Sequence, residues 1–197
     1  MFDRVGTGPA LRHRHTAQIA GEAYRKIGLT FSEPAMLEEF GEFNGEAILA
    51  QSLPQLLGRD GKIRELHDAL QNSSNETEKR ANFQRMFEAV IYLWANGEIK
   101  PQNVETWQDF CARVTRGLSN FLAKAGKGEV AAIFTSGGPL GVVVQWALHL
   151  SAQDTLRVAW MSRNCSYSEF LFSGDRLTLS SFNSFPHLDD DSLLTYR

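Results

Sequence analysis

The sequence predicts an α/β fold: a three-layer α/β/α domain with a mainly parallel central sheet and a helical insertion. One observation is the apolar run Val130–Phe134, which a small-residue turn joins to an apolar helix at Leu140–Leu150. A short run without polar interruptions is typical of a strand buried on both faces of a parallel sheet. Another is a pair of alternating runs, Cys165–Phe172 and Arg176–Phe182, which predict an antiparallel hairpin at the sheet edge. A chain of 197 residues is long enough for one such domain.

Composition excludes several functional classes. The net charge of −3 gives no basic surface for nucleic acid or anionic lipid, and no apolar run reaches the roughly 18 residues that a membrane helix needs. The two cysteines, Cys111 and Cys165, have no metal-binding spacing, so we expect two buried, reduced thiols in a cytoplasmic protein.

The first elements are predicted from residue type and spacing. Phe2–Val5 is typical of a strand, Gly6–Gly8 of a turn, and Pro9 to Gly28 of a helix. We expect the apolar residues of this helix to face the core; they are Leu11, Ile19, Ala20, Ala23 and Ile27. An irregular stretch follows with an acidic patch of four glutamates: Glu33, Glu38, Glu39 and Glu42.

The middle of the chain is predicted to be helical. Helices are expected at Glu46–Leu57, bent or ended near Pro54, and at Lys62–Gln71, with a longer one after a cap near Asn75. We interpret 46–103 as an insertion within a single domain of residues 1–197. Two further helices are expected at Val104–Ala125 and, as a short helix or turn, at Asp154–Trp160.

The turn after the central strand is a candidate anion site. Ser136, Gly137 and Gly138 precede an apolar helix whose first turn contains Pro139. Aligned peptide dipoles and unpaired N–H groups at a helix N-terminus favour an anion, phosphate above all. Glycine-rich turns of this kind also occur in α/β proteins that bind no ligand there. The turn by itself therefore does not show whether this protein binds an anion.

A basic cluster, Arg12-His13-Arg14-His15, begins the first helix. Arg12 and His15 share one helix face, while His13 and Arg14 point elsewhere. A guanidinium at a helix N-terminus opposes the dipole, which favours an anionic partner for Arg12. The alternative is a solvated basic surface.

Several segments, in chain order, resemble motifs of the histidine phosphatase superfamily, which has the phosphoglycerate-mutase-like fold. They are Phe2–Ala17 (similar to SSPLxRxxQTA), Leu37–Phe40 (LxE), Glu105–Arg113 (ESwxxFxxRv), Thr135–Gly138 (SHGG), Asn164–Phe170 (NxSxTE) and Phe182–His187 (xNxxxHL).

The resemblance implies hydrolysis of a small phosphate monoester through phosphohistidine. It assigns Arg12, Ser136 and the Gly137 amide to the phosphoryl oxygens, with Ser136 at the place of the family's second catalytic histidine. It assigns Glu39 as the general acid, with Glu38 as the alternative register. The substrate and the oligomeric state are not specified by the sequence, and the family pattern implies neither a metal nor another cofactor.

Two departures disturb this pattern. Serine at position 136 can donate a hydrogen bond but brings no positive charge. The Arg-His-Gly strand end that carries the family's nucleophile is absent from the sequence, because the Arg-His pairs Arg12-His13 and Arg14-His15 are followed by Arg14 and Thr16 instead of glycine. In the family that strand is central, next to the one ending at Ser136.

We therefore expect either that the natural product begins upstream of Met1 or that this chain completes its sheet in another way. One hypothesis is a truncated phosphatase that is inactive as written. Another is a pseudo-enzyme: a non-catalytic phosphate-binding or scaffold protein on the same fold. A third is an unrelated α/β domain.

Overall fold

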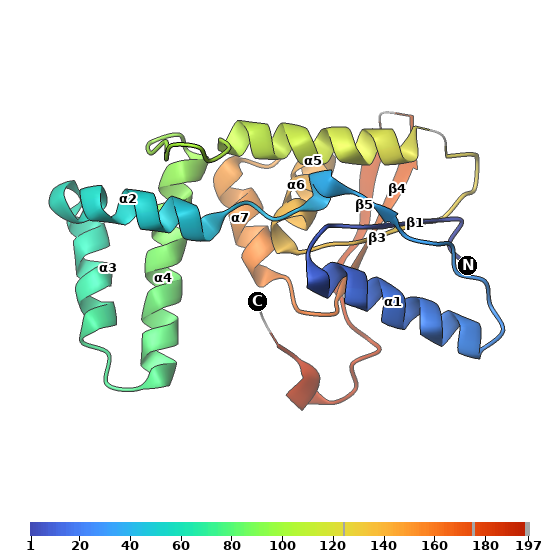
Figure 1. The fold of residues 1–197 in the computed structure, drawn as a ribbon, viewed down its shortest axis with the longest axis horizontal. Coiled ribbons are helices and arrows are strands. Elements are labelled where there is room, and N and C mark those ends of the chain that lie inside the picture. Colours follow the sequence, from blue (N-terminus) through green and yellow to red (C-terminus); the bar gives the residue numbers. More distant parts are fainter. Residues whose placement is uncertain (124, 175, 196–197) are drawn as a thin grey trace. The chain divides into compact units, whose positions relative to one another are not determined.

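The computed structural model describes residues 1–123, 125–174 and 176–195. Its contacts divide the chain into two compact units, which are described separately below (Figure 1). Unit 1 consists of Met1–Glu42 and Cys111–Arg197, and unit 2 of Phe43–Phe110. All the strands lie in unit 1.

Unit 1 contains the predicted parallel sheet. Strand β1 (Arg4–Thr7) lies between β2 (Ala35–Met36) and β3 (Ala131–Phe134) and runs parallel to both. Each β1 residue from Arg4 to Thr7 pairs in order with one residue of β3. The carboxyl ends of β1 and β3 therefore meet at the same edge of the sheet, as in α/β folds generally.

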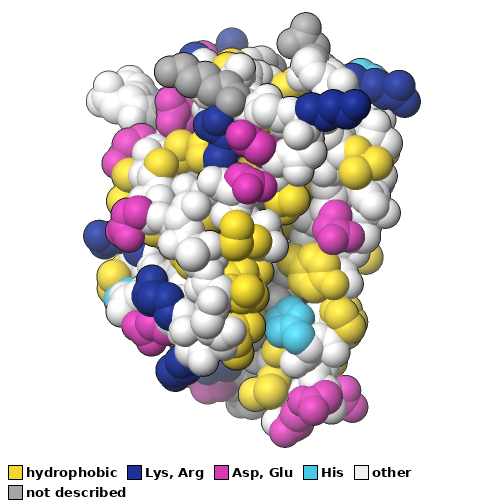
Figure 2. Space-filling view, turned by 90° about the vertical axis from the view of Figure 1, so that its right-hand side faces the viewer, with side chains coloured by type: hydrophobic (Ala, Val, Ile, Leu, Met, Phe, Trp, Pro, Cys, Tyr) yellow, Lys and Arg dark blue, Asp and Glu magenta, His cyan; other side chains and the backbone are white. Residues whose placement is uncertain are grey.

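The hairpin is confirmed, but its place in the sheet was wrong. Strands β4 (Tyr167–Ser173) and β5 (Arg176–Ser184) pair antiparallel, and within the described residues they form a sheet of their own rather than an edge of the parallel one. Strand β3 is half-buried along its whole length instead of buried on both faces, since β1 is its one neighbour in that sheet. Figure 2 shows apolar side chains at the surface on one face of the molecule.

Helix α1 (Leu11–Lys26) forms as predicted, but it buries a different face. The buried positions are His13, Ala17 and Gly21. The expected core residues Leu11, Ile19 and Ile27 are each more than half exposed. The reason is close packing: a Cβ on Gly21 would lie 2.9 Å from the ring of Phe31, so this face has room for small side chains only.

The predicted turn at Gly6–Gly8 was also wrong, because Gly6 and Thr7 belong to β1. A Cβ on Gly6 would lie 2.5 Å from Leu37 and 3.3 Å from the ring of Phe121. Glycine stands within this strand because neighbouring side chains approach its backbone closely.

Unit 1 contains further helices. They are η1 (Glu38–Phe40), α5 (Trp107–Leu122, whose residues from Cys111 belong to this unit), α6 (Gly137–Leu148), α7 (Ala152–Met161) and η2 (Asp191–Leu193). Figure 1 shows α1 on one side of β1 and β3 and the unit 1 part of α5 on the other. Phe121 of α5 faces Gly6. Helices on both faces of a parallel sheet give the three-layer arrangement that the sequence predicted.

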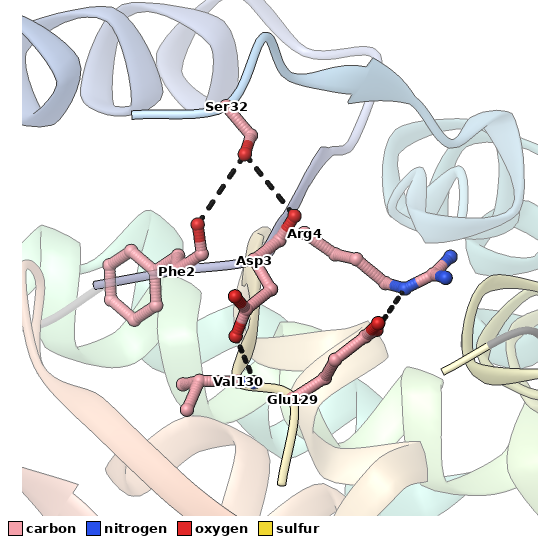
Figure 3. A network of polar contacts seen from close by, with 6 residues as sticks. All are labelled: Phe2, Asp3, Arg4, Ser32, Glu129 and Val130. Carbon is pink, nitrogen blue, oxygen red and sulfur yellow. Dashed lines mark hydrogen bonds and ion pairs between the residues drawn. The ribbon is translucent and has the colours of Figure 1, made fainter. Parts of the chain in front are cut away.

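A polar network joins the beginnings of β1 and β3 (Figure 3). The Val130 N–H donates to the carboxylate of Asp3 at 2.8 Å, and Arg4 Nε donates to Glu129 Oε2 at 2.7 Å. The Ser32 hydroxyl donates to the carbonyls of Phe2 and Asp3. The bonds of Asp3 and Arg4 thus link the segments at which the two paired strands begin.

Unit 2 is helical, and its predicted helices are confirmed. They are α2 (Gly45–Arg59), α3 (Gly61–Gln71) and α4 (Glu76–Ala95), and their N-caps are Asn44, Asp60 and Asn75. Helix α2 continues through Pro54 to Arg59 instead of ending there. The core of this unit includes a cluster of aromatic rings: Phe43, Trp94, Trp107 and Phe110. The interpretation of 46–103 as an insertion stays a prediction.

Both cysteines are free thiols, but the expectation that both are buried was wrong: Cys111 is half-buried and Cys165, beside the β4–β5 hairpin, is exposed. Across the described residues, every helix is too short or too polar to cross a bilayer.

Candidate functional site

The candidate site lies at the carboxyl edge of β1 and β3, where open α/β sheets bind their ligands. The segment after β1 is joined to the end of β3, because the Gly8 N–H donates to the Phe134 carbonyl at 2.9 Å. The segment after β3 is joined to η1, because the Thr135 hydroxyl donates to the Phe40 carbonyl at 3.0 Å. Three chain segments that are distant in sequence therefore meet at this edge.

The predicted helix start is confirmed: Ser136 is the N-cap of α6, and Gly137, Gly138 and Pro139 are buried in its first turn. The Ser136 hydroxyl makes no capping bond to its own helix. It donates instead to Glu42 Oε2 at 2.7 Å, and the Gly138 N–H donates to the same oxygen at 3.3 Å. The N-terminus of α6 thus holds a carboxylate, as the helix dipole favours.

Glu42 is the residue that sequence reasoning missed. Glu42 was named only as a member of the acidic patch and was given no role of its own. Because 94 positions separate Glu42 from Ser136, no local sequence pattern connects the two residues. The available signal was the glycine pair after Ser136. A Cβ on Gly138 would collide with the Glu42 carboxylate, and consecutive glycines at a helix start indicate that another group approaches the backbone closely.

The predicted acid, Glu39, has a different environment. Its side chain is half-buried against α5, where a Cβ on Gly117 would collide with it. Its carbonyl accepts a 2.7 Å hydrogen bond from Arg113. In the described part of the chain no hydrogen bond or ion pair joins the Glu39 carboxylate to Ser136. The alternative residue, Glu38, is exposed.

Arg12 and His13 are neighbours in the first turn of α1, but one is exposed and the other buried. Arg12 is exposed, and no described hydrogen bond or ion pair holds its guanidinium. His13 is 2 % exposed, and its Nδ1 lies 2.5 Å from the place that a Cβ on Gly8 would take. The structure therefore joins Ser136 and Gly138 to Glu42, but it joins neither Arg12 nor Glu39 to them. The described residues contain no group of three metal-ligating side chains that could hold an ion.

Comparison of the sequence with known families gives one match, which covers residues 47–184 and hence more than two-thirds of the chain. The matching profile describes the histidine phosphatase superfamily (branch 1). The chain belongs to this superfamily. The matched range contains the Ser136 turn and the β4–β5 hairpin, and it begins after Arg12, Glu39 and Glu42.

Two solved structures are similar to this chain at the level of the fold. The alpha-ribazole phosphatase from Shigella flexneri is 16% identical with a TM-score of 0.55. A protein from Escherichia coli str. K-12 substr. MG1655, assigned provisionally as an alpha-ribazole-5'-P phosphatase, is 15% identical with a TM-score of 0.56. Each comparison covers 93% of this chain and 74% of the other. Curated protein sequences give no match to this histidine phosphatase superfamily member.

Proposed function

We propose that unit 1 binds the phosphoryl group of a small phosphate monoester at the N-terminus of α6. The observation that carries this proposal is the Glu42 carboxylate, which accepts hydrogen bonds from the Ser136 hydroxyl and the Gly138 N–H. An anion is already stabilised at this turn, and phosphoryl oxygens need the same donors. Membership of a phosphatase superfamily supports a phosphorylated small molecule as the ligand.

The proposed roles follow the family pattern. Ser136 and the Gly137 amide donate to phosphoryl oxygens, and Arg12 supplies the positive charge that Ser136 lacks. Because Arg12 is exposed and its guanidinium is held by no described partner, its long side chain is available to turn toward a ligand. Glu39 is the proposed general acid. Ribazole phosphates are the first monoesters to test, since the structural neighbours are described as ribazole phosphatases.

We further propose that these 197 residues alone bind phosphate monoesters but turn them over negligibly. The sequence has no Arg-His-Gly segment, and without a nucleophilic histidine no phosphohistidine intermediate can form. The second candidate, a non-catalytic phosphate-binding protein, is supported by the same hydrogen bonds at Ser136 and differs in needing no added segment for its function.

The binding test is titration of the purified chain with inorganic phosphate by NMR, following the amides of Gly137 and Gly138. Arg12→Ala is expected to weaken binding by about tenfold or more, the effect of losing a charge-assisted hydrogen bond. Arg14→Ala is the matched control, because Arg14 is an exposed arginine on the same helix, and it should bind as the wild type does. Equal loss in both variants would mean that Arg12 acts only through the net charge.

The turnover test is hydrolysis of para-nitrophenyl phosphate together with a burst assay for phosphoenzyme. We expect no burst and negligible turnover. Robust hydrolysis that Arg12→Ala abolishes would contradict the proposal that these residues alone are inactive.

A further inference from the structure

One of the donors proposed for the phosphoryl group, the Ser136 hydroxyl, is already in use. The Ser136 hydroxyl has one proton to donate, and it donates this proton to Glu42 Oε2 at 2.7 Å. The Gly138 N–H points at the same oxygen at 3.3 Å. A phosphoryl oxygen that accepted these hydrogen bonds would take the place of the Glu42 carboxylate.

The two anions also exclude each other electrostatically. A carboxylate and a phosphoryl dianion in contact at a half-buried turn repel each other. The attraction of the α6 dipole for an anion is smaller than this repulsion, so it does not hold both anions at once. A ligand can therefore bind at this turn only when Glu42 moves away.

The backbone around Glu42 is held in position, so the carboxylate is preorganised. Arg113 donates to the carbonyls of Glu39 and Gly41 at 2.7 and 3.2 Å. The Thr135 hydroxyl donates to the Phe40 carbonyl at 3.0 Å. An acceptor fixed this close to its donors acts at a high effective concentration and loses little entropy on binding. The absence of a Cβ on Gly138 leaves the space that the carboxylate fills.

From these contacts we propose that Glu42 is a specificity-determining residue: an intramolecular competitor that sets the affinity of the α6 N-terminus for anions. The inference rests on the proposed function and adds the residue that regulates it. The site is open when Glu42 has moved away from Ser136 and Gly138. The apparent dissociation constant of an anion equals its intrinsic value divided by the open fraction, so Glu42 raises it. Weakly held anions fail to displace Glu42, and a phosphoryl group with additional contacts succeeds.

The experiment compares the binding of inorganic phosphate to the wild type, Glu42→Ala, Glu42→Gln and Glu33→Ala. Glu42→Ala removes the competitor and should lower the dissociation constant by about tenfold or more. Glu42→Gln keeps a hydrogen-bond acceptor without the charge and should bind with intermediate affinity. Glu33 is an exposed member of the acidic patch, so Glu33→Ala controls for the loss of one negative charge nearby and should bind as the wild type does.

The outcomes separate this inference from the proposed function. Affinity for phosphate that is equal or weaker in both Glu42 variants overturns the inference and leaves the proposed function standing. No binding of phosphate by any variant overturns the proposed function, and the inference with it. Urea unfolding of each variant checks the fold, and should Glu42→Ala fail to fold, Glu42→Gln decides alone.

Discussion

Arg4 and Glu129 are linked by a 2.7 Å hydrogen bond from Nε to Oε2 across 125 positions of the chain (Figure 3). The bond joins the first residue of β1 to the segment that leads into β3. The hydrogen bond from Arg4 lowers the pKa of the Glu129 carboxyl below its ordinary value. The charge of Glu129 is therefore linked to the stability of the sheet.

We predict that Glu129→Gln lowers the urea midpoint at neutral pH and has no effect at strongly acid pH. The carboxyl binds its proton more weakly in the folded chain than in the unfolded one. Its contribution is therefore complete above the ordinary pKa and is lost as the pH falls through the lowered, folded-state pKa. Urea midpoints of both proteins on either side of this range measure the effect, with Glu33→Gln as the exposed control. A difference between Glu129→Gln and the wild type that persists in acid would contradict the prediction.

Gly117→Ala is expected to destabilise unit 1. A Cβ at this position in α5 would collide with the side chain of Glu39, and such overpacking costs about 1–3 kcal/mol. The matched control is Gly58→Ala in α2, where a new Cβ would meet nothing within 4 Å. There the higher helix propensity of alanine should raise stability by up to about 1 kcal/mol. Urea unfolding checks both variants, and equal effects of the two substitutions would count against the packing at Gly117.

Ser136→His should strengthen anion binding as the pH is lowered. An imidazolium at the α6 N-cap brings the charge that serine lacks, and it forms only below the histidine pKa, which is ordinarily about 6.5. Sulfate is the suitable probe, because it stays a dianion between about pH 8 and pH 6. The ratio of the wild-type to the variant dissociation constant should rise about tenfold across this range. A ratio that does not depend on pH would show that the new side chain stays uncharged or points away from the anion.

The two thiols should react at different rates. Cys165 is exposed and Cys111 half-buried, so a thiol reagent should modify Cys165 in a fast phase and Cys111 in a slow one. Cys165→Ser should remove the fast phase alone, and addition of urea should merge the two phases in the wild type. A single phase in the folded wild type would contradict this order of exposure.

The elements that the sequence predicted well are those with local signals. Asn75 caps α4 by accepting from the Glu78 N–H, as the polar residues before that helix indicated. The β4–β5 hairpin and the Ser136 N-cap of α6 likewise follow from residues within a few positions of each other. Short-range chemistry determines such features, so one segment is enough to predict them.

The features that sequence reasoning got wrong depend on distant partners. The buried face of α1 consists of His13, Ala17 and Gly21, and at Gly21 the ring of Phe31 approaches the helix closely. The spacing of apolar residues in the helix gives no information on how near Phe31 comes. The strand residue Gly6 was assigned to a turn for the same reason. Within the site, the helix start at Ser136 was predictable from the residues beside it. The hydrogen bond from Ser136 to Glu42 was not, because the two residues are far apart in the sequence and no local pattern indicates that they meet.

The pairing of β1 with β3 has a consequence for synthesis on the ribosome. Residues Arg4–Thr7 are made more than a hundred residues before Ala131–Phe134, with which all four of them pair. At the usual elongation rates β1 waits roughly 6–25 seconds for β3, while its other partner among the described strands, β2, is already made. We therefore expect unit 2 to complete its helices first, while an unfinished strand near the amino end remains open to chaperones.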